Sequence, residues 1–323
     1  MNTIAQFVQQ GIKTDLELQC ALQTAMRLEF STIPPYLCAQ WSINTDPSDV
    51  AGMIRNIVIQ EMYHFALAGN ILAAIRGVPT IANKEFIPTY PTDMLPGEIH
   101  LDLELDLHPI SKKQLSVFME IEKPEFPPVS LALTIRPATI GAFYDTIIEG
   151  FRKVQPLIKI GAPFVGIKDI MSGAPIPDPK NGQITTVDQA IAAIARIKRE
   201  GEGTKGSPEQ PPDDVADGQD LAHYYVFKEI HDGKKWEKGA DGHWRPGDKK
   251  IILPTFFPFK KSTSAPDPSA KFNALLSQLL TSLQNCWIGA GAQPNIGQMM
   301  ALENVGGELI RRGVTPGFMW TAP

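Results

Sequence analysis

The feature that most constrains the fold is a pair of polar residues inside one apolar segment. Glu61 and His64 interrupt the run NIVIQEMYHFALAGNILAAIRG at residues 56–77. On an α-helix, residues three apart project to the same side, separated by about 4.5 Å along the axis. A carboxylate buried among apolar neighbours is costly unless it is paired or bound to a cation. The run therefore predicts a buried helix whose polar pair needs partners from other helices.

The periodicity of apolar residues predicts a mainly α-helical chain. Residues 14–44 carry apolar side chains at a three-to-four spacing, and a second helix at 48–77 is stopped by Gly77 and Pro79. The pair Pro34-Pro35 predicts a kink or break in the first helix. Further helices are predicted at 138–154, 186–203, 220–231, 271–287 and 296–313.

A different pattern occupies the segment after the first two helices. Residues 99–107, IHLDLELDL, alternate strictly between apolar and polar side chains, which predicts a half-buried strand. Residues 129–135 are its plausible partner. We therefore expect a small β-containing insertion within residues 79–185, and loop-like structure at 204–219 and 232–270.

Composition excludes several classes of function. The 323 residues are 43% hydrophobic and 20% charged, as in an ordinary soluble globule. A net charge of -5 without a basic patch argues against a nucleic-acid partner. Neither a signal peptide nor a run of 18 apolar residues is evident, so we expect a cytoplasmic protein with no membrane partner. The three cysteines lack CxxC spacing. We expect Cys38 to be a small, buried hydrophobic side chain rather than a metal ligand.

A second carboxylate-x-x-histidine pair strengthens the meaning of the first. Asp220 and His223 again stand three residues apart, before an aromatic helical stretch. Each pair is preceded by a helix with a candidate carboxylate, which is Glu29 before the first pair and Glu200 or Glu202 before the second. Glu149 and Asp145 are rivals for this last position.

Such a set is typical of carboxylate-bridged di-iron or di-manganese four-helix bundles. Carboxylates bridge two cations and neutralise their charge, while neutral imidazoles bind each metal terminally. Asp220 is one methylene shorter than the usual Glu, so it reaches one metal or binds through water. Each of these residues also has an interpretation without a metal. Glu29 would then lie on the surface near Arg27, His223 would stack on neighbouring tyrosines, and Glu202 would be a solvated charge.

Six segments of the chain resemble one known family. They are LQTAMRLEFSTIPPYLCAQWSI, IVIQEMYHFALAGNILAAIRG, FMEIEKPE, TIGAFYDTIIEG, REGEGT and LAHYYVFKEI, in this order over residues 14–312. Together they resemble the ferritin-like domain of the iminophenyl-pyruvate dimer synthase family. That domain occurs in the large synthases of violacein and rebeccamycin biosynthesis and in many standalone bacterial proteins.

The resemblance implies a set of metal ligands and two departures from the family. Expected ligands are Glu29, Glu61, His64, Glu202, Asp220 and His223. The family usually has Glu where this chain has Asp220, and often has Glu where this chain has Ala142. A reduced metal count or a changed reaction would follow from these departures.

These observations lead to one expected architecture and three functional hypotheses. We expect one domain over residues 1–323, a mainly α, ferritin-like four-helix bundle with extra C-terminal helices at 271–313. The bundle helices are expected at 14–44, 48–77, 186–203 and 220–231.

The first functional hypothesis is an oxidase or oxygenase of bacterial secondary metabolism. It would hold two iron ions, with manganese as the alternative, and act on a small, amino-acid-derived molecule with dioxygen or peroxide. The others are a ferroxidase or metal-handling protein and a non-catalytic scaffold with a degraded metal site. The oligomeric state stays open, a homodimer included.

Overall fold

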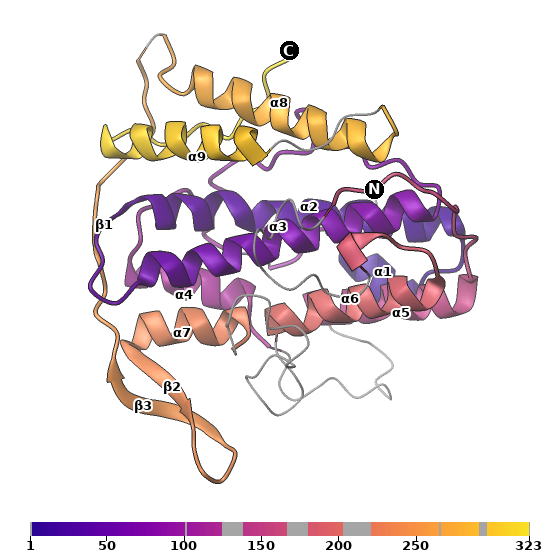
Figure 1. Ribbon diagram of the computed structural model, residues 1–323, viewed down its shortest axis with the longest axis horizontal. Coiled ribbons are helices and arrows are strands. Elements are labelled where there is room, and N and C mark those ends of the chain that lie inside the picture. The colour runs from indigo at the N-terminus through magenta and orange to yellow at the C-terminus, as the bar shows by residue number, and fades with distance from the viewer. Residues whose placement is uncertain are drawn as a thin grey trace.

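Two long antiparallel helices form the middle of the molecule in the computed structural model (Figure 1). They are α2 (Asp15–Trp41) and α3 (Val50–Ala74), which pack along one another over most of their length. A capping box between Thr14 and Glu17 starts α2. The structure describes residues 2–100, 102–124, 138–166, 180–202, 221–264, 266–290 and 296–322.

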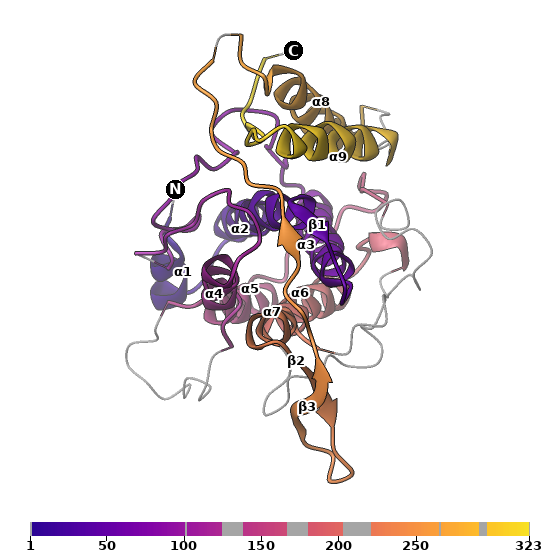
Figure 2. The ribbon, with the colours of Figure 1, turned by 90° about the vertical axis from the view of Figure 1, so that its left-hand side faces the viewer.

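Shorter elements surround this central pair. The further helices are α1 (Ile4–Gln10), α4 (Lys112–Ile121), α5 (Ile140–Val154), α6 (Val187–Glu202), α7 (His223–Asp232), α8 (Ala270–Trp287) and α9 (Ile296–Arg311), with a 3-10 turn at Lys180–Gly182. Strand β1 (Ile43–Thr45) pairs antiparallel with β4 (Thr255–Phe256), and β2 (Lys234–Lys238) forms a hairpin with β3 (Trp244–Lys250). This hairpin projects away from the helices (Figure 2).

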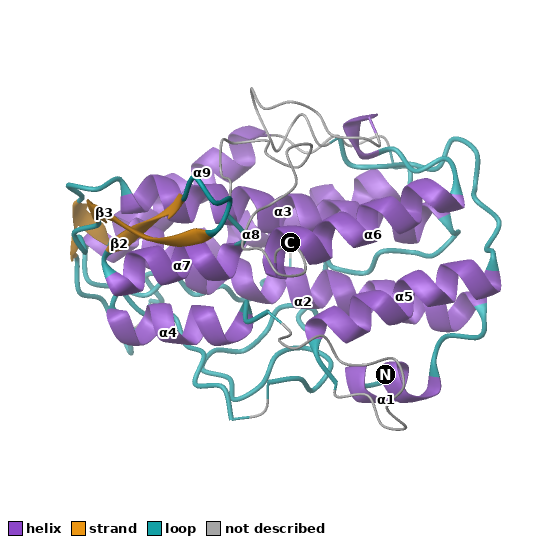
Figure 3. Cartoon of the chain, turned by 90° about the horizontal axis from the view of Figure 1, so that it is seen from below, coloured by secondary structure: helices purple, strands orange, loops and turns teal. Residues whose placement is uncertain are grey.

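The helices lie in three layers, with α8 and α9 on one side of α2 and α3 and the shorter helices on the other (Figures 1 and 2). In this last layer α4 and α5 lie in one row, and α7 and α6 lie in a second row (Figure 3). Helix α4 packs on α7, and α5 packs on α6. The bundle therefore has two continuous helices and two rows that each consist of two short helices.

This arrangement differs from the expected four bundle helices. The segments predicted at 186–203 and 220–231 were expected as two separate bundle helices, but α6 and α7 share one row. The other row is formed by α4 and α5, which lie in the expected insertion. Both rows are interrupted near the middle of the bundle, so four helix ends meet there. The prediction of a mainly α fold is nevertheless confirmed.

Helix α2 continues through Pro34 and Pro35, so the predicted break is wrong. A proline at position 35 leaves the carbonyl of Ser31 without its helical N–H donor. The buried hydroxyl of Tyr90 takes that place and donates to the Ser31 carbonyl at 2.7 Å. A side chain from the following loop thus supplies the hydrogen bond that the proline removes, and the helix can stay intact.

The predicted strand at 99–107 is also wrong. The chain forms isolated bridges there, from Thr92 to Leu105 and from Leu95 to Ile99. His100 and Asp102 adopt positive φ angles, which interrupt an extended backbone. The alternation still identified side chains that are buried, namely Ile99, Leu103, Leu105 and Leu107. Its proposed partner at 129–135 lies outside the described residues. The helices α1 and α4 and the β2–β3 hairpin were not predicted.

Helix α3 is long and apolar enough to cross a membrane by length and composition. However, 89% of its most apolar stretch is buried inside the molecule. Its apolarity is therefore that of a core helix, and it surrounds Glu61 and His64 with packed side chains.

The contact of Tyr90 with α2 leads to a stability prediction. Replacing Tyr90 by Phe leaves the buried carbonyl of Ser31 unpaired, which should lower the free energy of unfolding by about 1–3 kcal/mol. Chemical denaturation of the metal-free protein measures this change. The control is Tyr225→Phe, which removes a hydroxyl from a half-buried ring on α7 and should change stability by about 0.5 kcal/mol or less. Equal effects of the two variants would contradict the role of Tyr90.

Candidate metal centre

Three buried glutamates and two buried histidines meet where the two helix rows are interrupted. Glu29 comes from α2, and Glu61 and His64 from α3. Glu122 is the residue that caps the C-terminus of α4, and His223 is the first residue of α7. All five are at most 9% exposed. Helix ends thus deliver two of the five side chains, and intact helices deliver the other three.

Each of the three carboxylates has one oxygen held by a hydroxyl group. Tyr144 on α5 donates to Oε1 of Glu29. The hydroxyl of Tyr36 donates to Oε1 of Glu122 at 2.7 Å. Oγ1 of Thr32 lies 2.8 Å from Oε2 of Glu61, and shares its proton between this oxygen and a backbone carbonyl of α2. These contacts fix the carboxylate planes and leave the opposite oxygens directed elsewhere.

The opposite oxygens face the Nδ1 atoms of the two histidines. Nδ1 of His64 lies 3.4 Å from Oε2 of Glu29 and 3.9 Å from Oε1 of Glu61. Nδ1 of His223 lies 2.9 Å from the same Oε1 of Glu61 and 3.5 Å from Oε2 of Glu122. The centroids of the two imidazole rings are 5.7 Å apart. The residues therefore form two groups of three that share one carboxylate oxygen.

The other nitrogen of each imidazole is held from behind. Nε2 of His64 lies 2.6 Å from Oε2 of Glu200, a buried residue in the last turn of α6. Nε2 of His223 donates to Oε1 of Gln60 at 2.9 Å. With Nε2 engaged as a donor, Nδ1 is the nitrogen of each imidazole that can bind a cation once it has lost its proton.

Burial and mutual repulsion set the charges of the metal-free cluster. Burial, with the negative charge of Glu122, raises the pKa of Glu61 to about 7. Burial lowers the pKa of His223, but the charges of Glu122 and Glu61 outweigh it and raise that pKa to about 9. Burial also opposes the charge on His64, yet hydrogen bonding to Glu200 and Glu29 holds its pKa well above the ordinary value. Protons thus compensate the buried carboxylates when no cation does.

The donor geometry fits a pair of metal ions. Nδ1 of His223 is a buried polar atom that completes no hydrogen bond, because its 2.9 Å approach to Glu61 lacks the required alignment. Mixed carboxylate and imidazole donors suit iron, manganese and similar divalent cations. Glu29, Glu61 and His64 would hold one ion, and Glu61, Glu122 and His223 the other.

The structure brings together four of the six expected ligands, namely Glu29, Glu61, His64 and His223. The backbone of Glu202 ends α6 and its side chain lies outside the described residues, as does the whole of Asp220.

The other acidic candidates occupy different places. Glu200 is buried behind His64 rather than beside the second pair. Asp145 pairs with Lys198 at 2.8 Å, and Glu149 is exposed on α5. Cys38 is buried on α2 and belongs to neither group of ligands. Ala142 lies in the first turn of α5, two residues before Tyr144.

The sequence did not identify Glu122 as a candidate ligand. It follows a ten-residue helix, α4, and has no histidine at a three-residue spacing. The one signal was its position in the segment FMEIEKPE, which carries part of the family resemblance. That segment also holds Glu120, and only the fold distinguishes the exposed Glu120 from the buried Glu122.

Comparisons with known proteins identify the family of this fold. A family model described as ferritin-like matches residues 22–232, well over half of the chain. The chain belongs to the ferritin-like family. The matched range contains all five residues of the candidate metal centre.

A solved structure has a similar fold over nearly its whole length. It is the crystal structure of a ferritin-like protein from Caulobacter vibrioides, with a TM-score of 0.66 and 22% sequence identity. The match covers 94% of this chain and 97% of that one. At this identity the likeness supports the fold alone. None of the curated proteins matches the chain.

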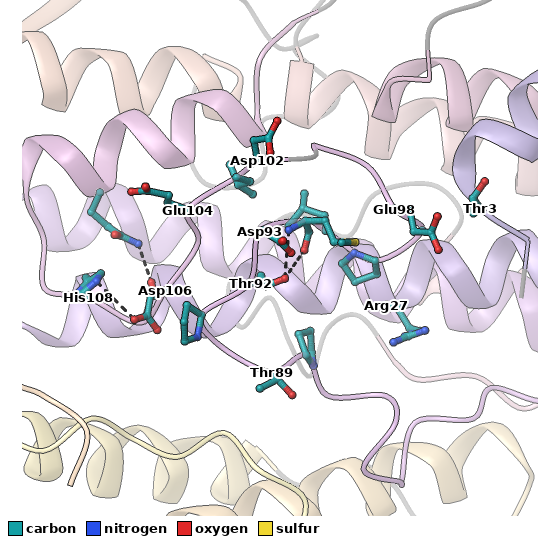
Figure 4. Close-up of a pocket in the computed structure, with 18 of the residues that line it drawn as sticks. Thr3, Arg27, Thr89, Thr92, Asp93, Glu98, Asp102, Glu104, Asp106 and His108 are labelled. Atoms are coloured by element: carbon teal, nitrogen blue, oxygen red, sulfur yellow. Dashed lines mark hydrogen bonds and ion pairs between the residues drawn. The ribbon is translucent and has the colours of Figure 1, made fainter. Parts of the chain in front are cut away.

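The cavity at the centre of this ferritin-like protein is small. It has a volume of about 40 Å³, and its apolar lining includes Leu28, Ile121, Ile140 and Ile197. Because one water needs roughly 10–15 Å³ measured this way, the space suits ions and a few small ligands. A much larger hollow of about 1130 Å³ lies on the surface along residues 88–108 (Figure 4). Acidic side chains such as Asp93 and Glu104 line it, and it contains none of the five residues of the metal centre.

The assignment of Glu122 as a metal ligand can be tested by replacing it and, as a control, the nearby Glu120. Glu122→Ala removes the carboxylate that belongs to the His223 group alone, so the protein should retain about one ion per chain instead of two. Elemental analysis after reconstitution with Fe²⁺ measures this. Glu120→Ala, an exposed carboxylate two residues earlier, should leave the metal content unchanged. Full metal content in Glu122→Ala would contradict its assignment as a ligand.

Metal binding should release protons from the cluster. The imidazoles and Glu61 must lose their protons to bind a cation, and their pKa values are raised, that of His223 to about 9. The apparent affinity for Mn²⁺ should therefore rise from about pH 6 to about pH 8, by up to roughly tenfold per pH unit for each proton displaced. Calorimetric titrations in two buffers with different ionisation enthalpies count the protons. An affinity that falls or stays constant over this range would contradict the charge assignment.

Proposed function

We propose that this ferritin-like protein binds two iron ions and uses them in an oxidase or oxygenase reaction on a small organic molecule. The observation that carries the proposal is the position of Oε1 of Glu61, which faces the Nδ1 atoms of both histidines. A carboxylate shared in this way is what a dinuclear centre requires, because it bridges two cations and offsets part of their charge.

The protein side chains have separable tasks in this proposal. Glu29, Glu61, Glu122, His64 and His223 hold the ions. Tyr144, Tyr36 and Thr32 keep the carboxylates in orientation through their hydroxyl groups. The apolar lining of the cavity limits the entry of water. When bound, two redox-active ions supply electrons for the reduction of dioxygen or peroxide.

The substrate class rests on the resemblance to the iminophenyl-pyruvate dimer synthase family. That resemblance supports a cytoplasmic enzyme of bacterial secondary metabolism that acts on an amino-acid-derived molecule. Manganese is the alternative to iron, because the same donors suit both. Within the described residues, each group of donors has carboxylates and one imidazole and no thiolate, which disfavours a metal that prefers soft ligands.

A second function is favoured by one observation, the volume of the cavity. A space of about 40 Å³ beside the ligands accommodates ions and dioxygen, whereas an aromatic amino acid is several times larger. A ferroxidase or metal-handling protein, in which Fe²⁺ itself is the substrate, needs nothing larger. The two functions differ in the substrate that is needed for continued consumption of dioxygen, which is an organic molecule for the oxidase and Fe²⁺ for the ferroxidase.

Metal content and oxygen consumption test the proposal together. Wild-type protein should hold about two iron or manganese ions per chain, and His64→Ala and His223→Ala should each hold fewer. The iron-loaded wild type should consume dioxygen continuously only when an amine or imine derived from an aromatic amino acid is present. Both measurements use the full chain, with circular dichroism to establish that the variants are folded.

The alternative outcomes are distinct. Continuous consumption with Fe²⁺ alone, beyond the two ions of the centre, would support the ferroxidase and contradict the organic oxidase. Absence of metal from the wild type after reconstitution with both iron and manganese would contradict both, and would leave a scaffold with a degraded site.

A further inference from the structure

The two halves of the metal centre match closely in their direct donors. Each has one imidazole Nδ1 and shares Glu61. Each also has a carboxylate of its own that a tyrosine hydroxyl holds, Glu29 with Tyr144 and Glu122 with Tyr36. We refer to them as the His64 half-site and the His223 half-site. Among the described residues, the difference between the two half-sites therefore lies in the groups behind the donors.

The groups behind the two imidazoles differ in charge. Nε2 of His64 lies 2.6 Å from a carboxylate oxygen of Glu200, whereas Nε2 of His223 lies 2.9 Å from the amide oxygen of Gln60. Both of these residues are 1% exposed, so little water screens the contacts. Both oxygens of Glu200 face N–H donors, Nε2 of His64 at one and the guanidinium Nε of Arg196 at the other, an arrangement that suits a carboxylate.

The charge of Glu200 acts mainly through its hydrogen bond. Nε of Arg196 binds the other carboxylate oxygen at 2.6 Å, so the Arg196–Glu200 pair carries little net charge seen from a distance. At short range, an anionic acceptor draws the Nε2 proton of His64 more strongly than an amide oxygen does. Electron density on Nδ1 rises accordingly, and Nδ1 becomes the better metal donor.

We propose that the centre fills in a fixed order, the His64 half-site binding the first divalent cation tightly and the His223 half-site binding the second more weakly. Glu200 and Gln60 are the positioning residues that set this order, through the imidazoles that they hold. This inference rests on the proposed dinuclear centre and deepens it. The ion at the His223 half-site is then the exchangeable one, so that a second metal species can enter there while the first ion stays.

A titration of the metal-free protein with Mn²⁺ tests the order. Electron paramagnetic resonance distinguishes a single bound Mn²⁺ from two coupled ions. The first equivalent should give the signal of an isolated ion, and the coupled signal should appear only with the second equivalent. His223→Ala should keep the first affinity of the wild type, while His64→Ala should lose it.

Two substitutions that exchange the acceptors test the cause. Glu200→Gln removes the charge at nearly constant shape and should weaken the first binding step by about 10- to 100-fold. Gln60→Glu gives His223 an anionic acceptor and should strengthen the second step relative to the first. Because the two effects have opposite directions, general damage to the fold cannot produce both.

Glu229→Gln is the matched control for the loss of a buried charge. Glu229 on α7 is 0% exposed and binds Lys235 and the backbone of Trp236, outside the metal centre. Its replacement can lower stability but should leave both Mn²⁺ affinities unchanged. A thermal melt of each metal-free variant establishes that it is folded.

The outcomes separate this inference from the proposed function. Two equal affinities, or a coupled signal from the first addition, would overturn the fixed order while the dinuclear centre stands. A reversed order would overturn it too, and would indicate that the positive charge of Arg196 outweighs the hydrogen bond. Absence of Mn²⁺ and Fe²⁺ binding in the wild type would instead refute the proposed function on which the inference rests.

Discussion

The buried charge of Glu61 is the constraint on which the rest of the structure depends. A carboxylate in the middle of an apolar helix is unfavourable unless opposite charge reaches it. In this protein the compensation comes from two imidazoles, which hold protons in the metal-free state and would hold cations in the loaded one. Because each imidazole needs further acceptors, one buried residue requires partners from α2 and from both rows of short helices.

The interrupted helix rows follow from that requirement. A continuous helix presents side chains outward at fixed intervals, whereas a helix end can direct its last or first residue toward a point in the bundle. Glu122 at the end of α4 and His223 at the start of α7 reach the cluster in this way. Helix α2 provides a continuous surface opposite them, and the contact of Tyr90 with Ser31 keeps it whole through its two prolines.

The metal centre also shows where specificity can lie when the direct donors are alike. In the part of the chain that the structure describes, the two half-sites have equivalent carboxylates, hydroxyls and imidazoles, and they differ in the residue behind each imidazole, Glu200 or Gln60. The ferritin-like fold therefore provides the helices that carry the donors, whereas the order of metal binding that we propose depends on single residues behind those donors. The similarity to the Caulobacter vibrioides protein, at 22% identity, concerns the fold alone.

The sequence by itself determined the helical class and the segment that carries Glu61 and His64, because apolar periodicity and a three-residue spacing are local properties. It also indicated Glu29 and His223 as partners, through a pattern of helices and pairs. It did not determine Glu122, the outer position of Glu200, or the sharing of one row by α6 and α7. These depended on the tertiary structure, because the ends of short helices have no periodicity, and only packing decides which of two nearby carboxylates, Glu120 or Glu122, is buried.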